Sequence, residues 1–125
     1  MRESVSLHVA TGRFSVCRLA PDTDVAQGDG AFWSVTRTPD ELSVVCETGR
    51  EPPGATTVGP WALMSVVGPL DFSLVGILES LLVPLAAEGV SVFTVSTFDT
   101  DHVLVRDEDL DAAVSALRAA GHAVD

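Results

Sequence analysis

Residues 74–85 carry a helical stripe, the feature that most limits what this chain can fold into. Six aliphatic side chains recur there at the spacing of one face of an α-helix. The pattern predicts a helix that begins near Asp71 or Ser73, contains Pro84, and ends at Gly89, since Asp and Ser favour helix starts and Gly favours helix ends. The six side chains are Leu74, Val75, Leu78, Leu81, Leu82 and Leu85.

The segments around this helix predict a ferredoxin-like order of elements. Strand patterns occupy residues 61–67, 90–97 and 102–106, and a short acidic corner joins the last two. A second helical pattern covers residues 107–121, and its acidic first residues favour a helix N-terminus. With a last short strand at 122–125, the second half reads βαββαβ. In this α+β fold two helices cover one face of an antiparallel sheet.

The first half of the chain is predicted to be mostly β. Residues 4–10 and 13–20 alternate β-forming and polar residues on either side of a Thr-Gly pair, which is typical of a β-hairpin. Further strands are expected over residues 31–37 and 42–47. Residues 48–60 hold three prolines and three glycines with no apolar period, which indicates a connection and a boundary between two units.

Composition excludes several classes of function. Seven arginines and no lysine oppose eighteen acidic residues, and the resulting net charge of −11 would repel nucleic acid. No apolar run approaches the ~20 residues of a membrane helix, and the N-terminal residues lack a secretory signal pattern. We expect a cytoplasmic protein with neither nucleic acid nor membrane as a partner. Cys17 and Cys46 lie in strand-like segments and are expected to be reduced and buried.

No catalytic motif is present in the sequence. It contains no GxSxG, HExxH or GxxxxGK[ST] pattern, and without lysine it has no Schiff-base nucleophile. Glu79 and Glu88 are interpreted as solvated helix positions. We therefore expect no enzyme, no cofactor and no metal site, although an enzyme of unknown type stays a weaker alternative.

Two blocks of sequence resemble the ACT domain family. They are GPLDFSLVGI, residues 68–77, and VSTFDTDHVLV, residues 95–105. The chain is most similar to the subclass found as tandem pairs in small bacterial proteins, in aspartate kinase regulatory regions and in the CASTOR arginine sensors. The resemblance implies an ACT domain over residues 58–125, preceded over residues 1–57 by an incomplete, β-rich ACT-like unit. Since the sequence contains no kinase domain, we expect it not to be an aspartate kinase, and the resemblance implies a role in sensing or regulation.

The resemblance also implies an amino-acid site where the loop before the first helix meets the acidic corner. Backbone N–H groups of residues 72–74 could hold an α-carboxylate, and Asp99 or Asp101 could pair with an ammonium or a basic side chain. The match to the arginine sensors carries over Thr97, Phe98 and Asp101. The full predicted ligand-binding set is Asp71, Phe72, Ser73, Leu74, Gly76, Ser96, Thr97, Phe98, Asp99 and Asp101.

Other interpretations of these residues stay open. Asp99 and Asp101 are common turn residues, and Phe98 could simply pack. Asp71 would cap the helix or else repel an anionic ligand. A metal site that includes His102 is disfavoured, because neighbouring strand residues point to opposite faces. His8 and His122 are expected at the surface.

The sequence thus predicts a regulatory protein that binds a free amino acid and is not itself a catalyst. The acidic corner favours arginine or lysine over aspartate. A homodimer is expected, with an unidentified regulated enzyme as a further partner. The alternative is a protein-interaction or oligomerisation module of the ACT fold that has no ligand.

Overall fold

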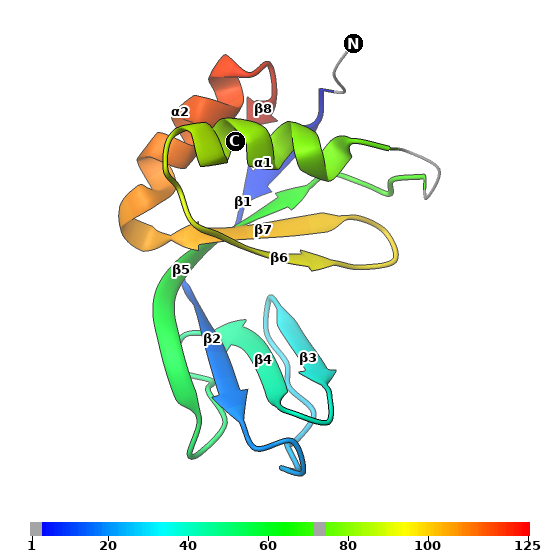
Figure 1. The fold of residues 1–125 in the computed structure, drawn as a ribbon, viewed down its shortest axis with the longest axis vertical. Helices are drawn as coiled ribbons and strands as arrows, with labels where there is room; N and C mark the ends of the chain where they lie inside the picture. The colour runs from blue at the N-terminus through cyan, green and yellow to red at the C-terminus, as the bar shows by residue number, and fades with distance from the viewer. Residues whose placement is uncertain (1–3, 72–74) are drawn as a thin grey trace. The chain divides into compact units, whose positions relative to one another are not determined.

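The computed structural model describes residues 4–71 and 75–125, which fall into two compact units. Met1–Thr11 and Ala62–Asp125 form the first, called the α+β unit, and Gly12–Trp61 form the second, called the β unit. Strand β5 (Thr56–Val66) supplies residues to both units (Figure 1). Each unit is described by itself.

The α+β unit contains the predicted βαββαβ elements together with one additional strand (Figure 1). Its strands run β6-β7-β5-β1-β8, and helices α1 and α2 pack against each other. Strand β1 pairs antiparallel with β5 and parallel with β8, so it lies between them. The bounds are β1 (Ser6–Val9), α1 (Ile77–Ala87), β6 (Val92–Ser96), β7 (Asp101–Arg106), the short 3-10 helix η1 (Asp107–Asp109), α2 (Leu110–Ala119) and β8 (Ala123–Val124).

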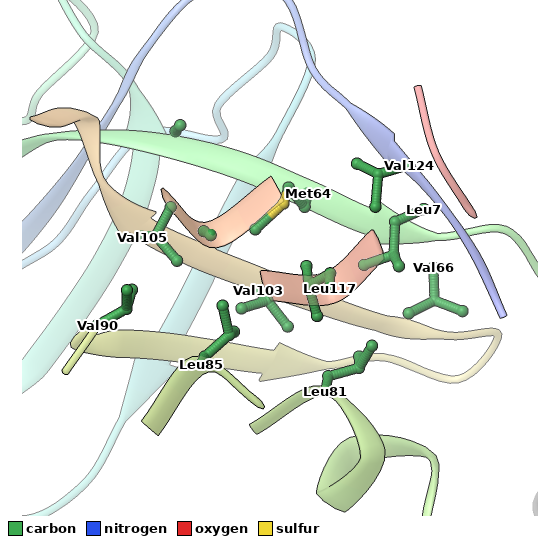
Figure 2. Close-up of a cluster of buried hydrophobic side chains, with 12 residues drawn as sticks. Leu7, Met64, Val66, Leu81, Leu85, Val90, Val103, Val105, Leu117 and Val124 are labelled. Atoms are coloured by element: carbon green, nitrogen blue, oxygen red, sulfur yellow. The ribbon is translucent and has the colours of Figure 1, made fainter. Parts of the chain in front are cut away.

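The core of the α+β unit lies between the helices and one face of the sheet. Leucines from α1 and α2 point at the aliphatic side chains of β5 and β7 (Figure 2). Ordinary burial of a leucine or valine side chain is worth about 1.5–3 kcal/mol, so this layer is the main source of stability for the unit. The side chains labelled in the figure are Leu7, Met64, Val66, Leu81, Leu85, Val90, Val103, Val105, Leu117 and Val124.

The predicted start of the first helix is wrong. Helix α1 begins at Ile77, and its N-cap is Gly76 with φ 88°, so Asp71 does not cap it. Glycine adopts this left-handed backbone without a steric penalty but weakens a helix interior by ~1 kcal/mol, so the helix starts after it. Val75 lies before the helix and is 86% exposed. Ser73 lies outside the described residues.

The predicted β-hairpin near the N-terminus is also wrong. Strand β1 pairs with β5 and β8, whereas β2 (Phe14–Leu19) pairs with β4 and with the first part of β5. The Thr-Gly pair between β1 and β2 therefore does not close a hairpin, although Gly12 has the positive φ that such a turn would need. The eleven residues of β5 give both strands a hydrogen-bonding partner, so the two do not need each other.

The β unit is mostly sheet, as predicted. Its strands run β3-β4-β2-β5 in antiparallel pairs, and residues 12–61, all of which the structure describes, contain no helix. Strands β3 and β4 span Trp33–Arg37 and Leu42–Glu47. Both free cysteines, Cys17 on β2 and Cys46 on β4, are buried in one apolar cluster, as predicted. Burial, together with the neighbouring Cys17, raises the pKa of the Cys46 thiol to about 12, so it stays protonated.

Strand β5 begins inside the segment that was predicted to be a connection. Its first residues pair with β2, and the register shifts so that Gly59 and Pro60 both oppose Ser15. Such a bulge accommodates a proline, which has no N–H to donate to a strand ladder. The connection is therefore shorter than predicted. The division of the chain between residues 57 and 58 stays a prediction.

His122 is buried, which corrects the prediction that it lies at the surface. It is 5% exposed, its Nε2 lies 3.0 Å from the carbonyl oxygen of Ser80, and its Nδ1 lies 3.2 Å from the backbone nitrogen of Val5. Pro84 has no N–H, so the helix itself leaves the Ser80 carbonyl without its usual donor. The Nε2–H of His122 replaces that donor, and its Nδ1 accepts from Val5. Pro84 lies inside α1, as predicted.

Replacing His122 should therefore destabilise the protein. In His122→Leu the Ser80 carbonyl and the Val5 N–H lose their partner, at about 1–3 kcal/mol for each buried group left unsatisfied. Urea unfolding measures the loss. His8→Leu is the matched control, because His8 is exposed and its surface contact with Asp125 is worth no more than ~1 kcal/mol.

A double-mutant cycle tests the cause of that loss. Pro84→Ala restores an N–H four residues after Ser80, so His122→Leu should cost less in the Pro84→Ala background by about 1 kcal/mol or more. Equal costs in both backgrounds would show that His122 does not replace the missing helical donor.

Candidate ligand-binding site

A cavity of about 230 Å³ opens at the corner between β6 and β7. Its walls are the corner, the segment before α1 and the first residue of α1, all within the α+β unit. Leu70, Ile77 and Thr100 line it beside six of the ten predicted site residues. The six are Asp71, Ser96, Thr97, Phe98, Asp99 and Asp101.

Among the described residues, one predicted site residue does not line the cavity. Gly76 is the N-cap of α1, next to the lining residue Ile77. An added Cβ at Gly76 would meet nothing within 4 Å, so no close approach requires a glycine there, and its positive φ is the reason for the residue type. Phe72, Ser73 and Leu74 lie outside the described residues.

Short hydrogen bonds fix the shape of the corner. The Thr97 N–H donates to the Thr100 carbonyl at 2.9 Å, and the Thr97 hydroxyl donates to the same oxygen at 3.0 Å. The Ser96 hydroxyl donates to Oδ1 of Asp101 at 2.6 Å. Asp101 therefore stabilises its own hairpin, as a turn residue would. Its carboxylate is also held in one place at the cavity wall.

The segment before α1 is joined to this corner by its backbone. The Leu70 N–H donates to the Asp99 carbonyl at 2.7 Å, and the Thr100 hydroxyl donates to the Val66 carbonyl at 2.7 Å. A Cβ built on Gly68 would lie 2.9 Å from the Asp99 oxygen and 3.1 Å from the Thr100 Cβ. Only glycine allows this close approach, which keeps both walls of the cavity together.

Gly68→Ala should push these two walls apart. We expect a loss of about 1–3 kcal/mol in the free energy of unfolding, the usual cost of inserting a methyl group into packed structure. Urea unfolding measures it. Val67→Ala is the control: Val67 is exposed, so its truncation should change stability by no more than ~0.5 kcal/mol. Similar values for the two variants would contradict the close approach.

The cavity is acidic. Asp71, Asp99 and Asp101 line it, whereas no arginine is among the lining residues that the structure describes. Carboxylates that converge on a partly enclosed space attract a cation, and guanidinium or ammonium groups form the strongest hydrogen bonds with them. Phe98 is 80% exposed and adds an aromatic surface on which a cation can rest.

His102 lies next to the cavity but is hydrogen-bonded to other residues. Its Nδ1 is 2.7 Å from the Ser65 hydroxyl, and its Nε2 is 3.4 Å from the Thr97 hydroxyl. Burial lowers the pKa of His102, and the nearby Asp101 opposes that shift only in part. The ring is therefore neutral at neutral pH. In residues 4–71 and 75–125 no three His, Cys, Asp or Glu side chains are grouped to hold a metal ion.

The lowered pKa of His102 predicts a pH dependence of stability. The unfolded state takes up a proton near the ordinary value of 6.5, but the folded state resists it. The stability contributed by neutral His102 is thus fully present above that pH and is lost as the pH drops below it. The free energy of unfolding should decrease from about pH 7.5 to about pH 5.5, and His102→Gln should show less of this decrease. Val67→Ala, at an exposed position without a titratable side chain, should keep the full decrease.

Comparison with known proteins identifies the family. The model of the ACT domain family matches residues 57–119. The chain belongs to the ACT domain family. A second model, which describes an N-terminal domain, matches residues 12–53. The resemblance inferred from the two sequence blocks is confirmed.

Curated relatives include sensors of arginine. The chain is 32% identical over 97 residues to subunit 1 of the cytosolic arginine sensor for mTORC1 from Bos taurus, a match that covers 69% of this chain and 30% of that protein. It is 34% identical over 59 residues to the human protein of the same name, which covers 46% of this chain and 18% of that one. The chain thus spans less than a third of the length of these relatives.

Solved structures share the fold. A crystal structure of an Agrobacterium tumefaciens protein is 36% identical, has a TM-score of 0.91 and covers 98% of this chain and 93% of its own. The regulatory subunit of aspartate kinase from Thermus flavus is 14% identical, with a TM-score of 0.65, and covers 94% of this chain and 99% of its own. The second likeness shows the fold alone.

None of the described helices is long and apolar enough to cross a membrane.

Proposed function

We propose that this protein is a regulatory sensor that binds a free amino acid in the cavity at the β6–β7 corner and has no catalytic activity of its own. The observation that carries the proposal is the convergence of six predicted ligand residues on one cavity in an ACT domain. Its volume, about 230 Å³, is below the ~300–1,000 Å³ of most drug-sized sites and suits a small metabolite.

The chemistry of the walls favours a basic amino acid. Asp99 and Asp101 would receive a guanidinium or ammonium group, and Phe98 would cover its apolar stem. The α-carboxylate would need donors at the opposite wall. Ile77, the first residue of α1, also lines the cavity, and the first N–H groups of a helix have no acceptor within it. Arginine fits this arrangement of charges best.

Regulation follows if the ligand binds two arrangements of the protein with different affinity, which is the requirement for any allosteric output. We propose a cytoplasmic homodimer that passes the signal to a separate enzyme. The names of the arginine-sensor relatives support a sensing role, although this chain spans only part of those proteins.

One observation favours a different function. Phe98 is 80% exposed beside the cavity, and Val67 and Val75 are exposed in the segment before α1. An apolar surface of this kind would also suit a protein-interaction module that has kept the fold without a ligand.

A thermal-shift screen against the twenty amino acids separates the two functions. A ligand at one hundred times its dissociation constant adds ~2.7 kcal/mol of stability, and we expect arginine to give the largest shift. Asp101→Asn should abolish it by removing the charge while keeping an oxygen for Ser96. Asp111→Asn, the same change at an exposed position of α2, should not.

The possible outcomes are distinct. No shift with any amino acid would favour the interaction module. A largest shift with aspartate or glutamate would keep the sensor and overturn the preference for a basic ligand. Equal effects of the two Asn variants would mean that overall charge, rather than this cavity, determines binding.

A further inference from the structure

The β unit holds a second cavity, of about 380 Å³, which lies wholly within residues 12–61. The loop of residues 23–29 forms one wall, and residues 50–53 form another. Leu19 and Trp33 contribute from the ends of β2 and β3. Its volume falls within the ~300–1,000 Å³ of typical small-molecule sites.

The floor of this cavity is apolar. Leu19 belongs to the buried cluster of the β unit, and Val25 and Trp33 pack against that cluster. The backbone of Gly28 lies against the face of the Trp33 ring, where an added Cβ would come within 1.8 Å of the indole. Any larger residue at position 28 would displace the ring, so the glycine fixes Trp33 as one side of the cavity.

The polar groups of the cavity leave an excess of negative charge. Arg50 forms an ion pair with Asp29, so its charge is already balanced. The Glu51 carboxylate accepts hydrogen bonds from the Ser15 hydroxyl at 2.6 Å and from the Gly49 N–H at 2.9 Å. These bonds hold it in place and lower its pKa, so it is ionised at neutral pH. Asp24 adds a further carboxylate.

We propose that this cavity binds a small organic cation that carries an apolar group, with its ammonium near Glu51 and Asp24 and its apolar body against Trp33. A preformed apolar floor with one fixed charge at its rim is the usual form of a small-molecule site, and an indole face adds attraction for a cation. The site lies in a different unit from the amino-acid cavity. It is therefore independent of the proposed function.

The tryptophan side chains supply the test. The chain contains two tryptophans, so protein labelled with ¹⁵N-tryptophan gives two indole signals, and Trp33→Phe assigns them. The probe is 2-phenylethylamine, and 3-phenylpropionate is an anion of similar size and shape. We expect saturable movement of the Trp33 signal with the amine and none with the carboxylate.

Matched variants locate the charge. Glu51→Gln should weaken amine binding by about tenfold or more, because a hydrogen bond to a charged group is worth ~1.5–3 kcal/mol. Asp40→Asn removes a carboxylate of the same unit outside the cavity and should leave the affinity unchanged. If Glu51→Gln fails to fold, Asp24→Asn takes its place, since Asp24 is exposed and should weaken binding without unfolding the protein.

Each of the following results would overturn the proposal. They are no saturable movement of the Trp33 signal at millimolar amine, equal binding of the carboxylate, or an equal loss in Asp40→Asn. Asp101→Asn, which alters the other cavity, should leave amine binding intact. Loss of binding in that variant would assign the amine to the β6–β7 corner and would also overturn a site in the β unit.

Discussion

The hydrogen bond from His122 to the Ser80 carbonyl is the buried polar interaction on which the α+β unit most depends. Pro84 interrupts the ladder of α1 four residues after Ser80, at a point where the helix covers the core. His122 supplies the missing donor at 3.0 Å, and its other nitrogen accepts from Val5 just before β1. One buried ring thus joins α1, the turn after α2 and the strand that lies between β5 and β8. An unsatisfied carbonyl there would weaken all three.

Hydrogen bonds between distant segments also hold the candidate site in place. Its carboxylates lie on an exposed corner, where side chains alone would be mobile. Backbone hydrogen bonds at Leu70 and Thr97, together with the close approach at Gly68, fix the corner and the segment before α1 to each other. The core holds α1 behind them. The arrangement of charge in the cavity therefore depends on the backbone, which the fold determines.

Local sequence patterns predicted most of the helices and strands. They could not predict which residues far apart in the sequence pair or form hydrogen bonds with each other. The leucine stripe predicted α1 because a periodic apolar face needs no knowledge of what covers it. The β1–β2 hairpin was wrong because two adjacent strand patterns do not reveal that β5 pairs with both. The burial of His122 was missed for the same reason. A proline within a helix predicts that one carbonyl lacks its helical donor, but the sequence does not indicate which distant residue donates to it. Residues of the corner were predicted together because they are contiguous in sequence.

The two proposed sites share a feature that would make ligand binding selective in an acidic chain. A net charge of −11 attracts every cation, and salt screens that attraction beyond about 8 Å, so the overall field cannot choose a ligand. One carboxylate that lines each cavity accepts a hydrogen bond from a serine hydroxyl at 2.6 Å: Asp101 from Ser96, and Glu51 from Ser15, which lies outside the cavity lining. A carboxylate held in this way has lost its rotational freedom before a ligand arrives, which lowers the entropic cost of binding. At the proposed sites, discrimination would therefore come from these two held carboxylates and the aromatic surfaces beside them.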